Sequence, residues 1–125
     1  MSNRHILIAD DDRNLRESLG EVLSGFGWQT TVVACGSQAI AELNRHRFDL
    51  LLSDVDMPDM TGFQLLAWAR DHEHGEPTVL MPTVLMSARA TADLGREARR
   101  LGAVTLLAKP VQVAELNSLV SSIFA

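Results

Sequence analysis

The fold of this chain is decided by residues Phe48–Pro58, FDLLLSDVDMP, where a short apolar run ends in two carboxylates and a proline. Three consecutive leucines suit a strand that is buried on both faces, because polar–apolar alternation is needed only where one face meets water. Pro58 has no N–H to give to a sheet, so the chain must turn shortly after Asp54. Open α/β sheets bind ligands at the carboxyl ends of their strands. Asp54 is thus expected at such an edge, although a lone Asp is equally well explained as the start of a surface loop.

The composition favours one folded domain over residues 1–125, because 46% of the 125 residues are apolar. The net charge of −5 argues against a large basic surface for nucleic acid. The first residues do not form a signal peptide, and no apolar run approaches the roughly 18 residues of a membrane span. Cys35 is the only cysteine, which excludes an intrachain disulfide and fits a reducing compartment. We therefore expect a cytoplasmic protein with no membrane association and no direct nucleic-acid binding.

Apolar runs predict five strands that alternate with five helices. Strands are expected at His5–Ala9, at Trp28–Ala34, within the opening stretch, at Pro82–Met86 and at Ala103–Ala108. The apolar faces of the five helices are expected to be formed, in order, by Leu15, Leu19, Val22, Leu23 and Phe26; by Ala39, Ile40 and Leu43 behind a Ser37 cap; by Phe63, Leu66 and Ala67 after Gly62; by Leu94, Ala98 and Leu101; and by Val113, Leu116, Val120 and Ile123. This alternation and right-handed crossovers predict a doubly wound α/β fold, with a flavodoxin-like parallel sheet of order 2-1-3-4-5 and helices on both faces.

The pentapeptide Pro-Thr-Val-Leu-Met occurs twice in succession, at residues 77–81 and 82–86. Two adjacent copies cannot fill one sheet position, and Pro82 argues against a single strand through both. We expect the second copy to be the buried fourth strand, because it runs directly into Ser87, and the first copy to extend the preceding loop. The repeat permits an ambiguity of register, and no function is inferred for it.

Polar side chains follow four of the predicted strands. Asp10 and Asp11 follow the first, Asp54 the third, Ser87 the fourth and Lys109 the fifth. The first and third strands are neighbours in the expected order, so three carboxylates crowd together and require a cation or a shared proton. Mg²⁺ suits such a site, because it binds one or two carboxylates together with waters and a phosphate oxygen. An Asp carboxylate can attack phosphorus, and an ammonium and a hydroxyl can stabilise the transferring group.

Each of these residues also has a simpler explanation. Asp10 or Asp12 can cap a helix, Ser87 can cap the next one, and Lys109 can be a solvated surface charge. Taken singly, these explanations are at least as good as the functional ones. Their joint occurrence at the ends of four strands on one edge favours a functional site.

The set resembles the receiver domains of response regulators in two-component signalling, over nearly the whole chain. The residues that carry the resemblance are Asp10-Asp11, Asp54 with Met57-Pro58 and Gly62, Ser87-Ala88 and Lys109-Pro110. The resemblance implies that Asp54 is the phosphoacceptor and that Mg²⁺ (or Mn²⁺) is bound by Asp11, Asp54 and the main-chain carbonyl of Asp56, with Asp10 assisting through water. It further implies that Ser87 and Lys109 stabilise the phosphoryl group, and that the Lys109–Pro110 bond is often cis.

The same resemblance implies the partners. A sensor histidine kinase or a phosphotransfer protein would supply the phosphoryl group, and a downstream output domain or protein would respond to it. It allows a dimer through the last two helices and the fifth strand. The domain would not be an enzyme, beyond catalysing its own phosphorylation and dephosphorylation.

Three places depart from the family pattern. Leu106 stands where receivers usually carry an aromatic residue that moves inward on switching, so output is expected to rest on the loop around Ser87 or on the helix of Leu94. Val111 replaces a common Phe, and the doubled pentapeptide lengthens the approach to the fourth strand. Asp56 and Arg89 occupy variable places at the rim of the site, and we hypothesise that they pair and restrict attacking water.

Two other functions remain as alternatives. Asp54-Val55-Asp56 also resembles the paired aspartates of haloacid-dehalogenase-like phosphatases, but the acidic pair precedes Asp54 and none follows Lys109. A receiver-like interaction domain that is never phosphorylated is the other alternative, with Leu106 as its only support.

Two groups of side chains outside this set are weaker candidates. His72 and His74 lack a third metal ligand. For the patch of Arg96, Arg99 and Arg100 the alternatives are a partner-facing surface and a solvated helix face, and the second is the better explanation.

Overall fold

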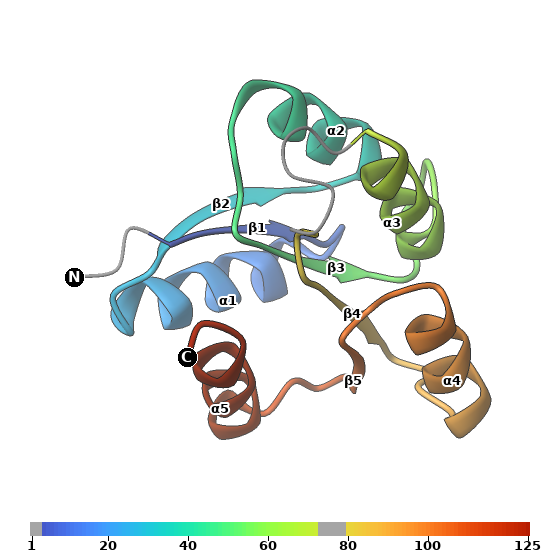
Figure 1. Ribbon diagram of the computed structural model, residues 1–125. Helices are drawn as coiled ribbons and strands as arrows, with labels where there is room; N and C mark the ends of the chain where they lie inside the picture. Colours follow the sequence, from blue (N-terminus) through green and yellow to red (C-terminus); the bar gives the residue numbers. More distant parts are fainter. Residues whose placement is uncertain (1–3, 73–79) are drawn as a thin grey trace.

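A computed structural model describes residues 4–72 and 80–125, which form five strands and five helices in alternation (Figure 1). The elements are β1 (His5–Ala9), α1 (Arg13–Gly25), β2 (Gln29–Val33), α2 (Gly36–Arg45), β3 (Leu50–Asp54), α3 (Gly62–Asp71), β4 (Thr83–Ser87), α4 (Ala92–Arg100), β5 (Thr105–Ala108) and α5 (Val113–Ile123). All strands are parallel, and the sheet order is β2-β1-β3-β4-β5. The predicted fold class and strand order are therefore confirmed.

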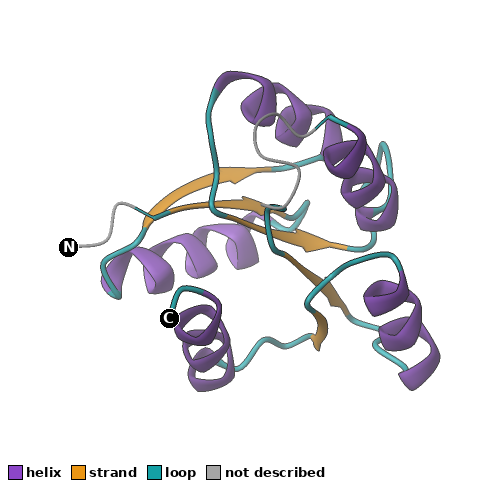
Figure 2. Cartoon of the chain, in the orientation of Figure 1, coloured by secondary structure: helices purple, strands orange, loops and turns teal. Residues whose placement is uncertain are grey.

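The central strand β3 is buried on both faces, as three consecutive leucines predicted. Leu50 and Leu52 face the layer of α1 and α5, while Leu51 faces the layer of α2 and α3. Helix α4 covers the remaining part of that second face through Ala98, which packs against Leu85 of β4. Helices thus lie on both sides of the sheet, as Figure 2 shows. This arrangement brings the carboxyl ends of all five strands to one edge.

The second copy of the pentapeptide enters the sheet, as expected. Thr83 to Met86 are fully buried in β4, and β4 pairs with β3 and β5. In the first copy, residues 77–79 lie outside the described residues, while Leu80 is exposed and Met81 packs under α2 and α3 without joining a strand. Arg70 of α3 donates hydrogen bonds to the carbonyls of Met81 and Gly102, at 2.9 and 3.2 Å. Arg70 therefore ties α3 to the segment just before β4.

Several details of the predicted helices are wrong. Ser37 does not cap α2, because the helix already begins at Gly36 and Ser37 lies in its first turn. Phe26 lies just past the end of α1, Leu101 at the end of α4 and Val113 at the start of α5, and all three side chains are exposed. Residues at the ends of a helix can fit the apolar spacing of the sequence although their side chains do not face the core. The second and fifth strands are also shorter than predicted.

None of the helices formed by residues 4–72 and 80–125 is long and apolar enough to cross a membrane.

Candidate functional site

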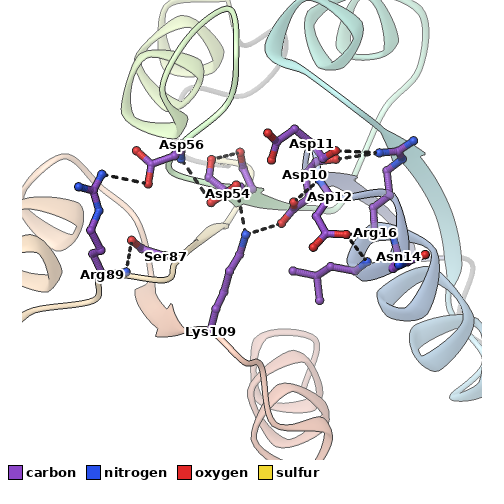
Figure 3. Close-up of polar contacts among 12 residues, drawn as sticks. Asp10, Asp11, Asp12, Asn14, Arg16, Asp54, Asp56, Ser87, Arg89 and Lys109 are labelled. Carbon is purple, nitrogen blue, oxygen red and sulfur yellow. Dashed lines mark hydrogen bonds and ion pairs between the residues drawn. The ribbon is translucent and has the colours of Figure 1, made fainter.

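The site lies at the carboxyl edge of the sheet, where Lys109 reaches from the end of β5 toward two carboxylates (Figure 3). Its Nζ is 2.8 Å from Oδ2 of Asp10 and 3.1 Å from Oδ2 of Asp54. Asp10 is fully buried and Asp54 is only 4% exposed. An ammonium shared by two buried carboxylates explains how both acids are tolerated in the interior. The Lys109–Pro110 peptide bond that follows is cis.

The two partners have shifted pKa values. Burial, and next the nearby Asp10 carboxylate, raise the pKa of Asp54 above its ordinary value, while contacts with Lys109 only partly offset them. Burial alone would lower the pKa of Lys109, but the two carboxylates outweigh it and raise that pKa. Lys109 is therefore a fixed positive charge, and ionised Asp54 is held in a site that a further cation would favour.

The three acidic residues after β1, Asp10, Asp11 and Asp12, make different contacts. Asp10 points inward, and its Oδ1 accepts a hydrogen bond from the Asp12 N–H at 2.9 Å. Asp11 is exposed at the edge of the site. Asp12 caps α1 by accepting hydrogen bonds from the N–H groups of Asn14 and Leu15. The helix-cap explanation thus holds for Asp12, and Asp10 stands free of α1 and beside Lys109.

One carboxylate oxygen from each of Asp10, Asp11 and Asp54 lies within 4.8 Å of the others. Three hard oxygen donors at this spacing fit a Mg²⁺ ion, which needs only one or two direct carboxylates and fills its other positions with water. A divalent charge at this place would also reduce the repulsion that raises the pKa of Asp54. The donor set therefore fits the metal that the sequence predicted.

Residues 55–61, which we call the β3–α3 loop, follow Asp54 and carry Asp56. The base of the loop is closed by a hydrogen bond from the Gly62 N–H to the Val55 carbonyl at 2.8 Å, and by an antiparallel bridge between Asp56 and Thr61. Gly62 approaches β3 so closely that a Cβ at this position would lie 2.5 Å from the carbonyl oxygen of Asp54. Glycine is therefore required at the start of α3.

Gly62→Ala is expected to move the β3–α3 loop away from Asp54, because a Cβ cannot fit against that backbone carbonyl. Overpacking of this kind costs about 1–3 kcal/mol of unfolding free energy, which chemical denaturation measures. Gly25→Ala is the matched control, because a Cβ there meets nothing within 4 Å. Equal stability of the Gly62→Ala variant and wild type would contradict this expectation.

Ser87 and Arg89 lie on the other side of Asp54, at the start of the β4–α4 connection. Ser87 is almost completely buried, and its Oγ accepts a hydrogen bond from the Arg89 N–H at 3.0 Å. Ser87 does not cap the next helix, because Thr91 caps α4. The Arg89 guanidinium is 3.7 Å from the Asp56 carboxylate, with side-chain exposures of 83% and 54%. A small pocket of about 280 Å³ lies between this pair, Ser87 and Leu94.

Leu106 lies on β5, which β4 separates from the strand of Asp54, and it is on the face of β5 that α4 covers. It is partly buried and packs against the cluster of Val55, Leu66, Leu85, Ala98 and Ala103. An aliphatic side chain in this cluster has no ring to turn between an inner and an outer position. The structure therefore places Leu106 where it connects α4 to the sheet without contributing a polar group.

Two residues that support the site were not predicted. Arg16 donates to the main-chain carbonyls of Asp10 and Asp11, at 3.4 and 3.3 Å, and holds the acidic run in place (Figure 3). Asp59 accepts hydrogen bonds from the N–H groups of Gly36 and Ser37. Arg16 lies one helical turn after Asp12, and this spacing could have indicated a contact with the acidic run. The partner of Asp59 is distant in sequence, and no local pattern indicates it.

The weaker candidates gain no support. His72 stacks on Trp68 with 4.2 Å between ring centroids, and its Nδ1 is 2.8 Å from the Trp68 carbonyl, while His74 lies outside the described residues. On the exposed face of α4, Arg96 pairs with Asp93 and Arg100 pairs with Glu97. These contacts are those of a solvated helix surface.

Comparison with known proteins identifies one family that this chain resembles. The family model for the response regulator receiver domain matches residues 6–121. Sporulation initiation phosphotransferase F of Bacillus subtilis is 33% identical over 120 residues, which cover 96% of this chain and 93% of that protein. Response regulator protein FleR of Pseudomonas aeruginosa is 38% identical over 117 residues, or 93% of this chain and only 24% of FleR.

Solved structures of response regulators have the same fold as this chain. The chemotaxis response regulator CheY4 of Vibrio cholerae has a TM-score of 0.87 at 25% identity, with 98% of this chain and 99% of that chain covered. A Francisella response regulator receiver domain has a TM-score of 0.88 at 26% identity, with 98% and 97% covered.

Proposed function

Because this chain belongs to the response regulator receiver family of two-component signalling, we propose that Asp54 accepts a phosphoryl group from a sensor histidine kinase or a phosphotransfer protein. A carboxylate oxygen of Asp54 attacks phosphorus, the bond from phosphorus to the donor nitrogen breaks, and an aspartyl phosphate forms. The leaving nitrogen keeps the bonding electron pair and takes a proton. The whole chain, residues 1–125, acts as one such domain in this proposal.

The observation that carries the proposal is the contact of one lysine with two buried carboxylates at the strand ends. Lys109 Nζ already lies beside the Asp54 oxygen, so it is placed to pair with a phosphoryl oxygen after transfer. The Ser87 hydroxyl, on the adjacent strand, is placed to donate a second hydrogen bond to that group. Its present contact is with a main-chain N–H, which leaves its own proton available.

The three carboxylates and the main-chain carbonyl of Asp56 would hold Mg²⁺ (or Mn²⁺), with Asp11 and Asp54 as direct ligands and Asp10 acting through water. When bound, the ion neutralises part of the charge on the phosphoryl oxygens. The protein supplies the acidic site, the Lys109 charge and the fixed backbone of the β3–α3 loop.

We further propose that the protein acts in the cytoplasm. A reducing compartment fits the free thiol of Cys35, and the kinase partner would act there as well.

The output surface is proposed to be formed by α4, β5 and α5. The Ser87 hydroxyl would move toward the phosphoryl group and carry the backbone of Arg89 with it, because the two are hydrogen bonded. That shift alters the start of α4 and so biases a two-state surface toward one partner-binding form. With Leu106 in the apolar cluster under α4, the readout rests on this loop and helix. The same surface would bind an output domain or protein, or a second copy of the chain.

Intact-protein mass measurement tests the proposal. Wild type is incubated with acetyl phosphate and Mg²⁺, in parallel with a sample that contains EDTA. Addition of one phosphoryl group per chain with Mg²⁺, and none with EDTA, is the expected result. Continuous turnover of many phosphate esters would favour the phosphatase alternative. No adduct on a folded chain would favour an unphosphorylated interaction domain.

Arg89→Ala is expected to shorten the lifetime of the aspartyl phosphate, because the Arg89–Asp56 pair stands at the rim and restricts the approach of water. An exposed pair contributes only about 0–1 kcal/mol to stability, so the melting temperature should hardly change. Arg100→Ala is the matched control, since that arginine also forms an exposed pair, with Glu97, but on the outside of α4. Equal lifetimes for wild type and Arg89→Ala would contradict the proposed role.

A further inference from the structure

Helix α2 has an unusual N-terminal cap, because the cap is supplied by a residue far away in sequence. The local N-cap residue, Cys35, makes no side-chain hydrogen bond to the helix. Instead, Oδ1 of Asp59 accepts from the Gly36 N–H at 2.9 Å, and Oδ2 accepts from the Ser37 N–H at 2.8 Å. Both oxygens of one carboxylate are therefore used, at the end of the helix where negative charge is favoured.

This contact joins α2 to the β3–α3 loop, which carries Asp56. The base of that loop is fixed at Gly62 and Thr61, as described above, and its far end is fixed to α2 by Asp59. Asp59 therefore adds a polar attachment to α2 at the end of the loop that lies away from its base.

A second contact beside Asp59 supports the same attachment. Met60 lies directly over Gly36, so that a Cβ on Gly36 would overlap the Met60 side chain. Met60 also packs against the core cluster under α2 and α3. The two hydrogen bonds donated by the N–H groups of Ser37 and Gly36 lower the pKa of Asp59, because they favour its charged form. A close fit and an ionic hydrogen-bond pair thus hold the same two residues of the loop.

We propose that Asp59 is a positioning residue for the metal site: by fixing the β3–α3 loop to the first turn of α2, it sets where the Asp56 main-chain carbonyl lies. The inference rests on the proposed function, in which that carbonyl is a Mg²⁺ ligand. Asp59 itself neither touches the phosphoryl group nor binds the ion. It acts through the backbone of the loop, in the way that outer residues orient the ligands of other metal sites.

The test compares Asp59→Ala, Asp59→Asn and Gln38→Ala with wild type. Gln38→Ala is the matched control, because Gln38 lies in the same first turn of α2 and accepts a hydrogen bond from the Ala34 N–H at 2.8 Å, without contact to the loop. Asp59→Asn keeps the shape of the side chain but leaves a single acceptor oxygen for two N–H groups. Circular dichroism confirms that each variant is folded before binding is measured.

Mg²⁺ affinity is measured by titration calorimetry on the unphosphorylated chain, and phosphorylation by acetyl phosphate is followed across Mg²⁺ concentrations. Asp59→Ala is expected to weaken Mg²⁺ binding by roughly tenfold, the low end of the effect of outer residues on metal affinity. The Mg²⁺ concentration for half-maximal rate should rise by the same factor, while the rate at saturating Mg²⁺ stays near that of wild type. Asp59→Asn should lie between the two, and Gln38→Ala should match wild type.

Unchanged Mg²⁺ affinity in Asp59→Ala would overturn the inference, and so would an equal loss in Gln38→Ala, which would indicate general loosening of α2. Absence of Mg²⁺ binding in wild type would overturn it as well. Failure of the proposed function looks different: wild type would then bind Mg²⁺ in the calorimeter but take up no phosphoryl group at any Mg²⁺ concentration. The calorimetric comparison of the variants would still decide the role of Asp59.

Discussion

Asp54→Asn is expected to abolish phosphoryl uptake and, in metal-free buffer at neutral pH, to raise the free energy of unfolding. Uptake is lost because an amide cannot serve as the nucleophile. Stability rises because burial and the Asp10 carboxylate raise the pKa of Asp54 in the folded chain, so its ionised form opposes folding. Intact mass after acetyl phosphate treatment and urea unfolding in EDTA measure the two effects.

The pH dependence of the second effect has a definite sign. A carboxyl group whose pKa is raised on folding favours the folded state below its unfolded pKa, which is near 3.8 for Asp, and loses that contribution as pH rises through the folded value. The stability difference between Asp54→Asn and wild type should therefore be largest at neutral pH and shrink as the pH is lowered toward 3.8. A difference that grows on acidification would contradict the burial explanation, and an adduct on Asp54→Asn would contradict its assignment as acceptor.

Lys109→Ala is expected to damage both the fold and the chemistry. Its ammonium is the cation that contacts both Asp10 and Asp54, and removing one partner of a buried ion pair costs about 3–5 kcal/mol. Because the Lys109 side chain is 17% exposed, we expect the lower end of that range. Phosphorylation by acetyl phosphate should slow by about 10²-fold, the typical loss for one transition-state donor.

Lys109→Arg is the control that separates charge from size. It keeps the positive charge, so it should retain most of the stability while its larger head group still slows the reaction.

Mg²⁺ should restore part of the stability lost in Lys109→Ala, because the ion then offsets the charge of the carboxylates that Lys109 contacts in wild type. Urea unfolding with and without Mg²⁺ measures both effects. Unchanged stability of Lys109→Ala in EDTA would show that the lysine does not balance the buried acids.

The strand order and the composition of the edge could be predicted from sequence, since they depend on local patterns. Leu50, Leu51 and Leu52 have no polar alternation, and this alone indicates a strand covered on both faces. Once the strands are parallel, residues that follow them must share an edge. Asp10, Asp54 and Lys109 meet there as predicted, although their chemical roles remain proposals.

What could not be predicted depends on contacts between distant segments. Ser37 has the residue type of a helix cap, but the helix begins one residue before it and the Asp59 carboxylate accepts a hydrogen bond from its N–H. The side chains of Phe26 and Val113 fit the helical period, but Phe26 lies just past the end of α1 and Val113 is the first residue of α5. Both side chains are exposed. The sequence places Gly62 just before a helix, but it does not indicate that this residue lies directly against the Asp54 carbonyl. In each case tertiary packing overrides the local pattern.

Identification of the modified residue tests the central claim most directly. Wild type is phosphorylated with acetyl phosphate and Mg²⁺, the acyl phosphate is reduced with borohydride to the corresponding alcohol, and the peptides are sequenced by mass spectrometry. We predict that reduction converts Asp54 alone, in the peptide that carries the end of β3. Conversion of Asp10, Asp11 or Asp56 instead, or a phosphoryl group on a histidine, would contradict the assignment of Asp54 as the phosphoacceptor.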